Sequence, residues 1–210
     1  MSALVLYDYW RSSAAYRVRI ALGLKGLSWE SRPIDLAKGE QRHADYRAVN
    51  PQALVPALLV DGQLLTQSLA IIDYLEARWP EPALLPSDPV QRAQVMAQAL
   101  VIAADTHPIQ NLRVLNYLRG ELAQPEDAVQ AWARHWIVLG FATLEEQAPE
   151  TGLFGGAVPN LADLCLVPQM ANARRFEVDL VPFPRLVRID AALRQIPAFI
   201  NAAPEAVKPA

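Results

Sequence analysis

The sequence predicts a small α/β unit followed by an all-helical region. Short β-type runs alternate with helical segments in the first part of the chain, whereas nearly every later stretch has helical periodicity. Four prolines separate the two parts, at positions 80, 82, 86 and 89, and they forbid a continuous helix there. We therefore predict one domain in residues 1–80, a proline-rich linker in residues 81–89 and an all-helical domain in residues 90–210.

The first part reads as strand, helix, strand, hairpin and helix. The expected strands are residues 4–9, 28–34, 54–60 and 63–65. A helix begins near Trp10 and ends at the stop signal Gly26, residues 38–49 are polar and weakly helical, and Asp61-Gly62 is a hairpin signal. The polar residues 66–68 begin another helix. This order is typical of a compact α/β domain.

Proline is unusual inside the third expected strand. Because it cannot donate to a sheet ladder, Pro56 should mark the first residue of that strand. Both isomers of the Val55-Pro56 bond stay open, and a cis bond would present the Val55 backbone outward.

The helical part contains one segment that is apolar nearly all round, residues 161–176, and we expect it to be the central buried helix. Asn160 is its predicted N-cap, and Asp163 can complete a capping box. Residues 184–203 supply one or two closing helices.

Two other helical segments precede this one, residues 90–120, which Pro108 should interrupt, and residues 125–150. Their expected buried stripes are Ala93, Ala97, Leu100 and Ala104 in the first, and Trp132, Trp136, Leu139 and Leu144 in the second.

Composition and charge exclude several classes of protein. The 210 residues carry a net charge of −3 and no basic cluster, which argues against nucleic acid as a partner. The single cysteine, Cys165, rules out an internal disulfide and is predicted to be a core residue. The three histidines lack zinc-ligand spacing, so we expect no metal. Without a secretory signal or an apolar run of about 18 residues, we place the protein in the cytoplasm and away from membranes.

Two adjacent hydroxyls, Ser12 and Ser13, mark the turn between the first strand and the first helix. The backbone N–H groups at a helix start have no partner within the helix and the dipole is positive there, which suits an anion or a thiolate. Serine is also a favoured N-cap in any helix. A simple capped helix and a thiolate site both remain open from this stretch alone.

Four spaced motifs extend the argument beyond that turn. They are Arg11-Ser12-Ser13 with residues 17–22, Asn50-Pro51-Gln52 with Val55-Pro56, residues 67–72, and residues 107–111. In this order, and over essentially the whole chain, they resemble the zeta-class glutathione transferases, which include maleylacetoacetate isomerases and maleylpyruvate isomerases. The resemblance implies the glutathione transferase fold, with a thioredoxin-like N-terminal domain and a helical C-terminal domain, bound glutathione and a homodimer.

The resemblance also implies which residues hold glutathione. Ser12 would donate a hydrogen bond to the sulfur, with Ser13 as its neighbour and backup. The Val55 backbone would pair with the cysteinyl part. The other implied contacts are Gln67 and Ser68 for the γ-glutamyl end and Gln41 for the glycyl end.

Four residues match family positions further from the sulfur. Gln110 corresponds to a residue that reaches the tripeptide, from the same chain or across the dimer, and a solvated helix residue is the alternative. Arg11, His107 and Arg175 match positions that hold the carboxylates of the substrate, and Arg175 is preferred to the adjacent Arg174.

The family's reaction is a cis–trans isomerisation, in which a thiolate adds to the double bond of a maleyl compound, the bond rotates, and elimination gives the fumaryl isomer. We expect a glutathione-dependent isomerase that converts maleylacetoacetate, a dicarboxylate of tyrosine catabolism, to fumarylacetoacetate. Ala14 replaces a cysteine common in the family, and Leu112 stands where we expect an arginine in maleylpyruvate isomerases. A maleylpyruvate isomerase, a transferase acting on α-haloacids and a non-catalytic glutathione-binding module remain alternatives.

Overall fold

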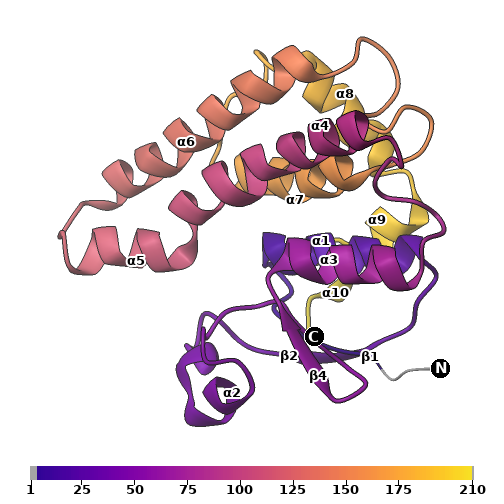
Figure 1. Cartoon of the computed structure of the whole chain (residues 1–210). Coiled ribbons are helices and arrows are strands. Elements are labelled where there is room, and N and C mark those ends of the chain that lie inside the picture. The colour runs from indigo at the N-terminus through magenta and orange to yellow at the C-terminus, as the bar shows by residue number, and fades with distance from the viewer. Residues whose placement is uncertain (1–3, 210) are drawn as a thin grey trace. The chain divides into compact units, whose positions relative to one another are not determined.

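The structure, a computed structural model, describes residues 4–209. Their contacts divide the chain into two compact units. The first comprises the described residues up to Ala83 and those from Ile196 onward, and the second comprises Leu84–Gln195. Figure 1 shows the elements of both units along the chain.

The first unit is built on a four-stranded mixed sheet. Its strands are β1 (Leu4–Asp8), β2 (Glu30–Pro33), β3 (Ala57–Val60) and β4 (Gln63–Thr66), in the order β2-β1-β3-β4. Strand β1 is parallel to β2 and antiparallel to β3, which in turn is antiparallel to β4. The predicted strand–helix–strand unit followed by a hairpin is therefore confirmed.

Helices cover this sheet on both faces. Helices α1 (Ser13–Leu24) and α3 (Ser68–Arg78) lie along one face (Figure 1). The short helix α2 (Ala44–Val49) and the 3₁₀ turn η1 (Glu40–Arg42) follow β2. Val5 and Tyr7 of β1 pack in one cluster with Tyr46 of α2, because alternate residues of a strand point to opposite faces.

The element boundaries sharpen three predictions. Helix α1 begins at Ser13, with Ser12 as its N-cap, and not near Trp10 as expected. Strand β3 begins at Ala57, directly after Pro56, and the Val55-Pro56 bond is cis. Gly26, with φ +64°, follows the C-cap of α1, as the stop signal predicts.

The C-terminal segment, predicted as part of the helical domain, packs on the first unit instead. Helix α9 (Pro197–Ala202) contacts α1, and α10 (Pro204–Val207) follows it. The hydroxyl of Tyr16 donates to the Phe199 carbonyl at 3.2 Å, and Arg19 Nε donates to the Ala202 carbonyl at 2.9 Å. These bonds join residues distant in sequence, which local periodicity does not detect.

The second unit is helical. Its elements are α4 (Pro89–Leu100), the π-helical η2 (Val101–Thr106), the 3₁₀ turn η3 (Pro108–Gln110), α5 (Leu112–Gly120), α6 (Glu126–Gln147), α7 (Leu161–Arg175) and α8 (Pro184–Leu193). Pro108 interrupts the first helical segment, as predicted. Helix α7 contacts α4 and α8 and is buried along most of its length, Cys165 included, so the central helix is also confirmed. Within residues 4–209, no helix is long and apolar enough to cross a membrane.

The predicted stripes of α4 and α6 are wrong. Of the eight positions only Leu144 is buried, whereas Leu100 is 39% and Leu139 is 49% exposed. The residues that face the core are Val95 and Ala99 of α4, and Val129, Ala133, Ile137, Phe141 and Leu144 of α6. An alanine buries little apolar surface, so a row of alanines does not identify the inner face.

The predicted capping box at the start of α7 is present. The Asn160 side chain accepts hydrogen bonds from the backbone N–H groups of Ala162 and Asp163. The Asp163 carboxylate accepts from Asn160 N at 3.0 Å, and also from Phe154 N and Gly155 N at 3.1 and 2.9 Å. Asp163 therefore fixes the loop before α7 as well as the helix start.

The stability of the fold should depend on the protonation of Asp163. Burial raises its pKa to about 6, against the opposing effect of three backbone N–H donors. The ordinary pKa of an aspartate in the unfolded chain is about 3.9, so the folded state binds this proton more tightly. The contribution of Asp163 is therefore fully present below about pH 4 and is lost as the pH rises through about 6.

Urea unfolding from pH 4 to 7.5 tests this with Asp163→Asn, which does not titrate, as reference. The difference in unfolding free energy, wild type minus variant, should fall by about 2 to 3 kcal/mol over this range. Other titrating groups cancel in the difference. A difference that grows with pH would mean that the N–H donors outweigh burial.

Arg19 holds the first unit together through a buried ion pair. Its Nη1 lies 2.7 and 2.8 Å from the two carboxylate oxygens of Asp8, and both residues are buried. Replacing Arg19 by Met leaves Asp8 as an unpaired buried carboxylate, which should lower the unfolding free energy by about 3 to 5 kcal/mol. Adding Asp8→Asn should restore part of the loss.

The matched control is Arg32→Met, which breaks the exposed pair with Glu30. Because this pair is solvent-exposed, its loss should change the unfolding free energy far less than the loss of Arg19 in the same denaturant titration. Equal losses for the Arg19 and Arg32 variants would contradict the role given to the buried pair.

Candidate functional site

The register of the sheet brings four site-bearing segments to one end. Asp8 at the end of β1 pairs with Pro33 of β2, and Tyr7 pairs with Ala57, which pairs with Thr66. The turn after β1, the loop after β2, the chain before β3 and the chain after β4 therefore all leave the sheet at the same end. The predicted glutathione contacts in these segments are Ser12, Ser13, Gln41, Val55, Gln67 and Ser68.

Ser12 caps helix α1 and keeps a proton to donate. Its Oγ accepts a hydrogen bond from Ala15 N at 3.2 Å, and its carbonyl accepts from Tyr16 N at 2.8 Å. A hydroxyl that caps a helix acts as an acceptor, so its own O–H remains available to an anion or a thiolate. The capping alternative is confirmed and is compatible with the thiolate site. Ser13 is buried and Ser12 is half-buried.

The start of α3 is strained. Gln67 precedes the helix with φ +68°, which residues other than glycine rarely adopt. Its Nε2 donates to Gln52 Oε1 at 3.2 Å. Ser68 is buried, and its hydroxyl accepts from Arg17 Nη1 at 3.2 Å, which connects the starts of α3 and α1. Strain of this kind is frequent at functional sites.

Two buried arginines, Arg17 and Arg19, support this end of the sheet. The sequence had predicted no role for either of them. Besides Asp8, Arg19 bonds the Trp10 carbonyl at 3.0 Å and so fixes the turn before Ser12. Burial raises the pKa of the Asp8 carboxyl, while Arg19 acts against that rise. Asp8 was the feature of the sequence that could have indicated this ion pair, because a carboxylate at the end of an apolar strand needs a cation when it is buried.

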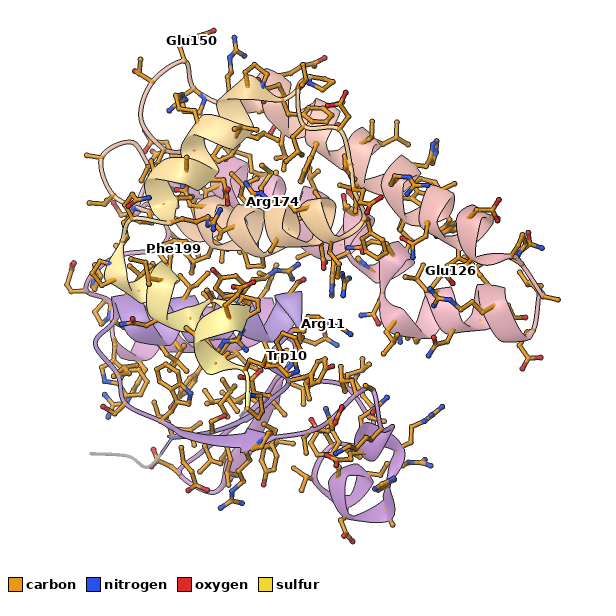
Figure 2. All side chains as sticks on the ribbon, turned by 180° about the vertical axis from the view of Figure 1, so that it is seen from behind. Trp10, Arg11, Glu126, Glu150, Arg174 and Phe199 are labelled. Carbon is orange, nitrogen blue, oxygen red and sulfur yellow. The ribbon has the colours of Figure 1, made fainter. Side chains whose placement is uncertain are left out.

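Gln41 and Arg11 complete the predicted residues of the first unit. Gln41 lies in η1, and its buried Oε1 has no hydrogen-bond partner among residues 4–209. Arg11 is exposed on the turn, with its guanidinium carbon 5.5 Å from the centre of the Trp10 ring. Figure 2 shows the side chains of Trp10 and Arg11 next to each other. A buried acceptor without a partner and an exposed cation are both free to take part in ligand binding.

Three predicted residues belong to the second unit. Gln110 is 2% exposed and donates from Nε2 to Gln169 Oε1 at 3.2 Å, so the solvated alternative is wrong. His107 is half-buried at the end of the π-helical stretch. Arg175 ends α7, exposed, with its guanidinium 4.6 Å from the Phe176 ring centre.

Arg174 forms an ion pair near the end of α7. Its Nη2 lies 2.5 Å from Oδ2 of Asp190, which is fully buried on α8. This ion pair connects α7 to α8. Gln169 is a further buried polar residue that sequence reasoning did not identify.

The chain is similar to known proteins in sequence and in fold. A family model described as the N-terminal domain of glutathione S-transferase matches residues 11–78. A probable maleylacetoacetate isomerase of Vibrio cholerae is 51% identical, over 98% of this chain and 97% of its own length.

Two solved structures are similar over nearly their whole length. One is a holo structure of a maleylpyruvate isomerase, a bacterial zeta-class glutathione transferase, with a TM-score of 0.95 and 45% identity over 97% of this chain and 98% of that one. The other is a maleylacetoacetate isomerase of Methylobacterium extorquens with bound malonate and glutathione, with a TM-score of 0.94 and 38% identity over 98% of this chain and 100% of that one. By sequence and by fold, the chain belongs to the zeta-class glutathione transferase family.

Proposed function

We propose that this protein is a glutathione-dependent cis–trans isomerase that converts maleylacetoacetate to fumarylacetoacetate. One observation carries the proposal most directly, the Ser12 hydroxyl at the start of α1, which has a proton to donate and stands beside the exposed cation Arg11. The relatives named maleylacetoacetate isomerase support the substrate, and a neighbour holds a dicarboxylate, malonate, together with glutathione. Tyrosine catabolism is the process that such a reaction would serve.

The residues at this end of the sheet fit the chemical groups of glutathione. Ser12 supplies a donor for the sulfur, and the unsatisfied Oε1 of Gln41 supplies an acceptor for a backbone amide. The start of α3, at Gln67 and Ser68, offers N–H groups and a positive dipole end to the γ-glutamyl carboxylate. The Val55 backbone would pair with the cysteinyl part, and Gln110 is the proposed contact from the second unit.

When bound, glutathione supplies the thiol that adds to the cis double bond and is eliminated after rotation. An ordinary thiol, with a pKa of about 8.5, is only about 3% ionised at pH 7. Lowering that pKa by about 2 makes it roughly three-quarters ionised, which corresponds to about 2.7 kcal/mol. The hydrogen bond from Ser12 and the positive end of α1 favour the ionised form, with Ser13 as the neighbouring hydroxyl.

Cations are needed for the substrate because maleyl compounds carry two carboxylates. Arg11 and Arg175 are the proposed carboxylate partners, and His107 has a supporting role. The same cations stabilise negative charge as it develops on the substrate during addition.

Maleylpyruvate is the second candidate substrate. A similarity to a maleylpyruvate isomerase structure, with a TM-score of 0.95, favours it. Against it, Leu112 begins α5 where we expect an arginine in that enzyme, and it leaves the position without a cation.

A second copy of the chain and a cytoplasmic location complete the proposal. Helix α4 exposes Val90, Ala93, Ala97 and Leu100 at helical spacing, an apolar row that a homodimer would cover. Sedimentation equilibrium distinguishes this dimer from a monomer. The single thiol of the chain, which is buried and unpaired with another cysteine, supports the cytoplasm.

A spectrophotometric assay tests the activity with the two cis substrates and an α-haloacid. We expect glutathione-dependent loss of the cis absorbance, with kcat/KM higher for maleylacetoacetate than for maleylpyruvate, and slower release of halide from the haloacid. Turnover that does not depend on glutathione would contradict the proposal. Glutathione binding in a calorimeter without any turnover would indicate a non-catalytic binding module.

Replacing Ser12 separates activation of the sulfur from binding. Ser12→Ala should lower kcat by about 100-fold or more, as loss of a single charge-stabilising donor does, while glutathione affinity changes little. The ultraviolet difference absorbance of the bound thiolate should be lost at neutral pH.

Ser12→Thr is the matched control, because it keeps both the cap and the donor, and it should restore most of the activity. Since the alanine variant also loses an N-cap worth about 1 kcal/mol, its unfolding free energy is measured alongside. Equal losses of affinity and turnover would mean that Ser12 only positions the ligand.

A further inference from the structure

Two buried side chains at the two ends of α2 hold one backbone carbonyl in the chain before β3. The Tyr46 hydroxyl donates a hydrogen bond to the Leu54 carbonyl at 2.6 Å, and Asn50 Nδ2 donates to the same oxygen at 2.8 Å. Tyr46 is 4% and Asn50 is 1% exposed. Because a carbonyl oxygen has two lone pairs, both of its acceptor positions are filled, and the Leu54 carbonyl is fixed from two directions.

Asn50 also shapes the loop that leads to Leu54. Its Oδ1 accepts a hydrogen bond from Gln52 N at 3.1 Å, and its own carbonyl accepts from Ala53 N at 2.9 Å. Ala53 has φ +54°, a conformation that residues other than glycine rarely adopt. The donor and the acceptor of the Asn50 amide are therefore both used, and together they keep a strained loop in one conformation.

The ring of Tyr46 is anchored on the sheet. It packs with Val5 and Tyr7 of β1 and with Ala57 of β3, and its centre lies 5.7 Å from that of the Tyr7 ring. Burial raises the pKa of Tyr46 to about 12, so its hydroxyl keeps the proton and remains a donor at neutral pH. Asn50 N donates to the Tyr46 carbonyl at 2.7 Å, which joins the two side chains to one helix end. Both donors therefore have fixed positions relative to the sheet.

The orientation of the Leu54 carbonyl decides that of the Val55 N–H. The two belong to one planar peptide group, and in a trans group the C=O and N–H bonds point in opposite directions. The Val55 N–H therefore points away from the two donors that hold Leu54. The ladder of β3 runs from Ala57 to Val60, so neither β1 nor β4 pairs with Val55 in the part of the chain that the structure describes.

We propose that Tyr46 and Asn50 are positioning residues for glutathione, which hold the Leu54 carbonyl and thereby direct the Val55 N–H toward the cysteinyl part of the tripeptide. The inference rests on the proposed function, in which the Val55 backbone pairs with that part. A backbone contact that is oriented before the ligand arrives binds more tightly, because no conformational freedom is lost when it forms. Tyr46 and Asn50 act through the peptide group and not on the sulfur, so they should affect binding more than turnover.

Titration calorimetry of the full chain with glutathione at pH 7 tests these roles. Tyr46→Phe removes one donor to the Leu54 carbonyl and should raise Kd about threefold, whereas Asn50→Ala removes the other donor together with the bond to Gln52 and should raise it about tenfold. At saturating glutathione, kcat should change less than about twofold in either variant, because the Val55 contact is alike in the ground state and the transition state.

Tyr16→Phe is the matched control, because it also removes a buried hydroxyl that donates to a backbone carbonyl, that of Phe199 at 3.2 Å. Like Tyr46→Phe, it should lower the unfolding free energy, but it should leave the Kd for glutathione unchanged. A Kd that stays at the wild-type value in Tyr46→Phe and Asn50→Ala, or that rises equally in Tyr16→Phe, overturns the inference. Should Asn50→Ala fail to fold, Tyr46→Phe alone decides.

A second ligand, γ-glutamylcysteine, identifies the part of glutathione concerned, because it keeps the cysteinyl part and lacks the glycine. Tyr46→Phe and Asn50→Ala should weaken its binding by the same factors, whereas Gln41→Ala, which removes the proposed glycyl contact, should weaken glutathione alone. Losses in the first two variants that are confined to glutathione would contradict the inference. A wild type that bound neither compound would overturn the proposed function together with this inference, whereas tight binding by the wild type and by both variants would overturn the inference alone.

Discussion

The bond between Arg19 and Asp8 is the interaction on which the functional end of the first unit depends. Arg19 is almost fully buried, and besides both carboxylate oxygens it bonds the carbonyls of Trp10 and Ala202. One side chain thereby fixes the end of β1, the turn before Ser12 and the C-terminal helix α9. Because a buried pair is costly to break from one side, these three segments keep one arrangement.

Arg17 is a second buried cation, and it holds the start of α3. Residues two apart on a helix point about 200° away from each other, so Arg17 and Arg19 reach opposite sides of α1. Arg17 bonds the hydroxyl of Ser68, and Arg19 bonds the turn and α9. The starts of α1 and α3, where the proposed sulfur and γ-glutamyl contacts lie, are thus held by two buried cations of one helix.

The sequence was sufficient for the local features of this fold and insufficient for its long-range contacts. The capping box at Asn160, the Ser12 cap and the interruption at Pro108 depend on neighbouring residues, and each was predicted. The exposed alanine row of α4 and the packing of α9 on α1 depend on which surfaces meet, and both were missed. The roles of Arg17 and Arg19 were missed for the same reason, since their partners include residues distant in the chain.

The distribution of sulfur explains why the turn carries hydroxyl groups. Ala14 occupies the position where family members commonly have a cysteine, and the single thiol of the chain, Cys165, is buried in α7 of the other unit. Neither unit therefore offers its own exposed thiol among the described residues. A helix start that favours a thiolate, with a serine hydroxyl that still has its proton to donate and a strained Gln67 at the same end of the sheet, suits a sulfur that arrives with a ligand. In the proposed function, the thiol of glutathione is the nucleophile, and the residues of this turn stabilise its ionised form.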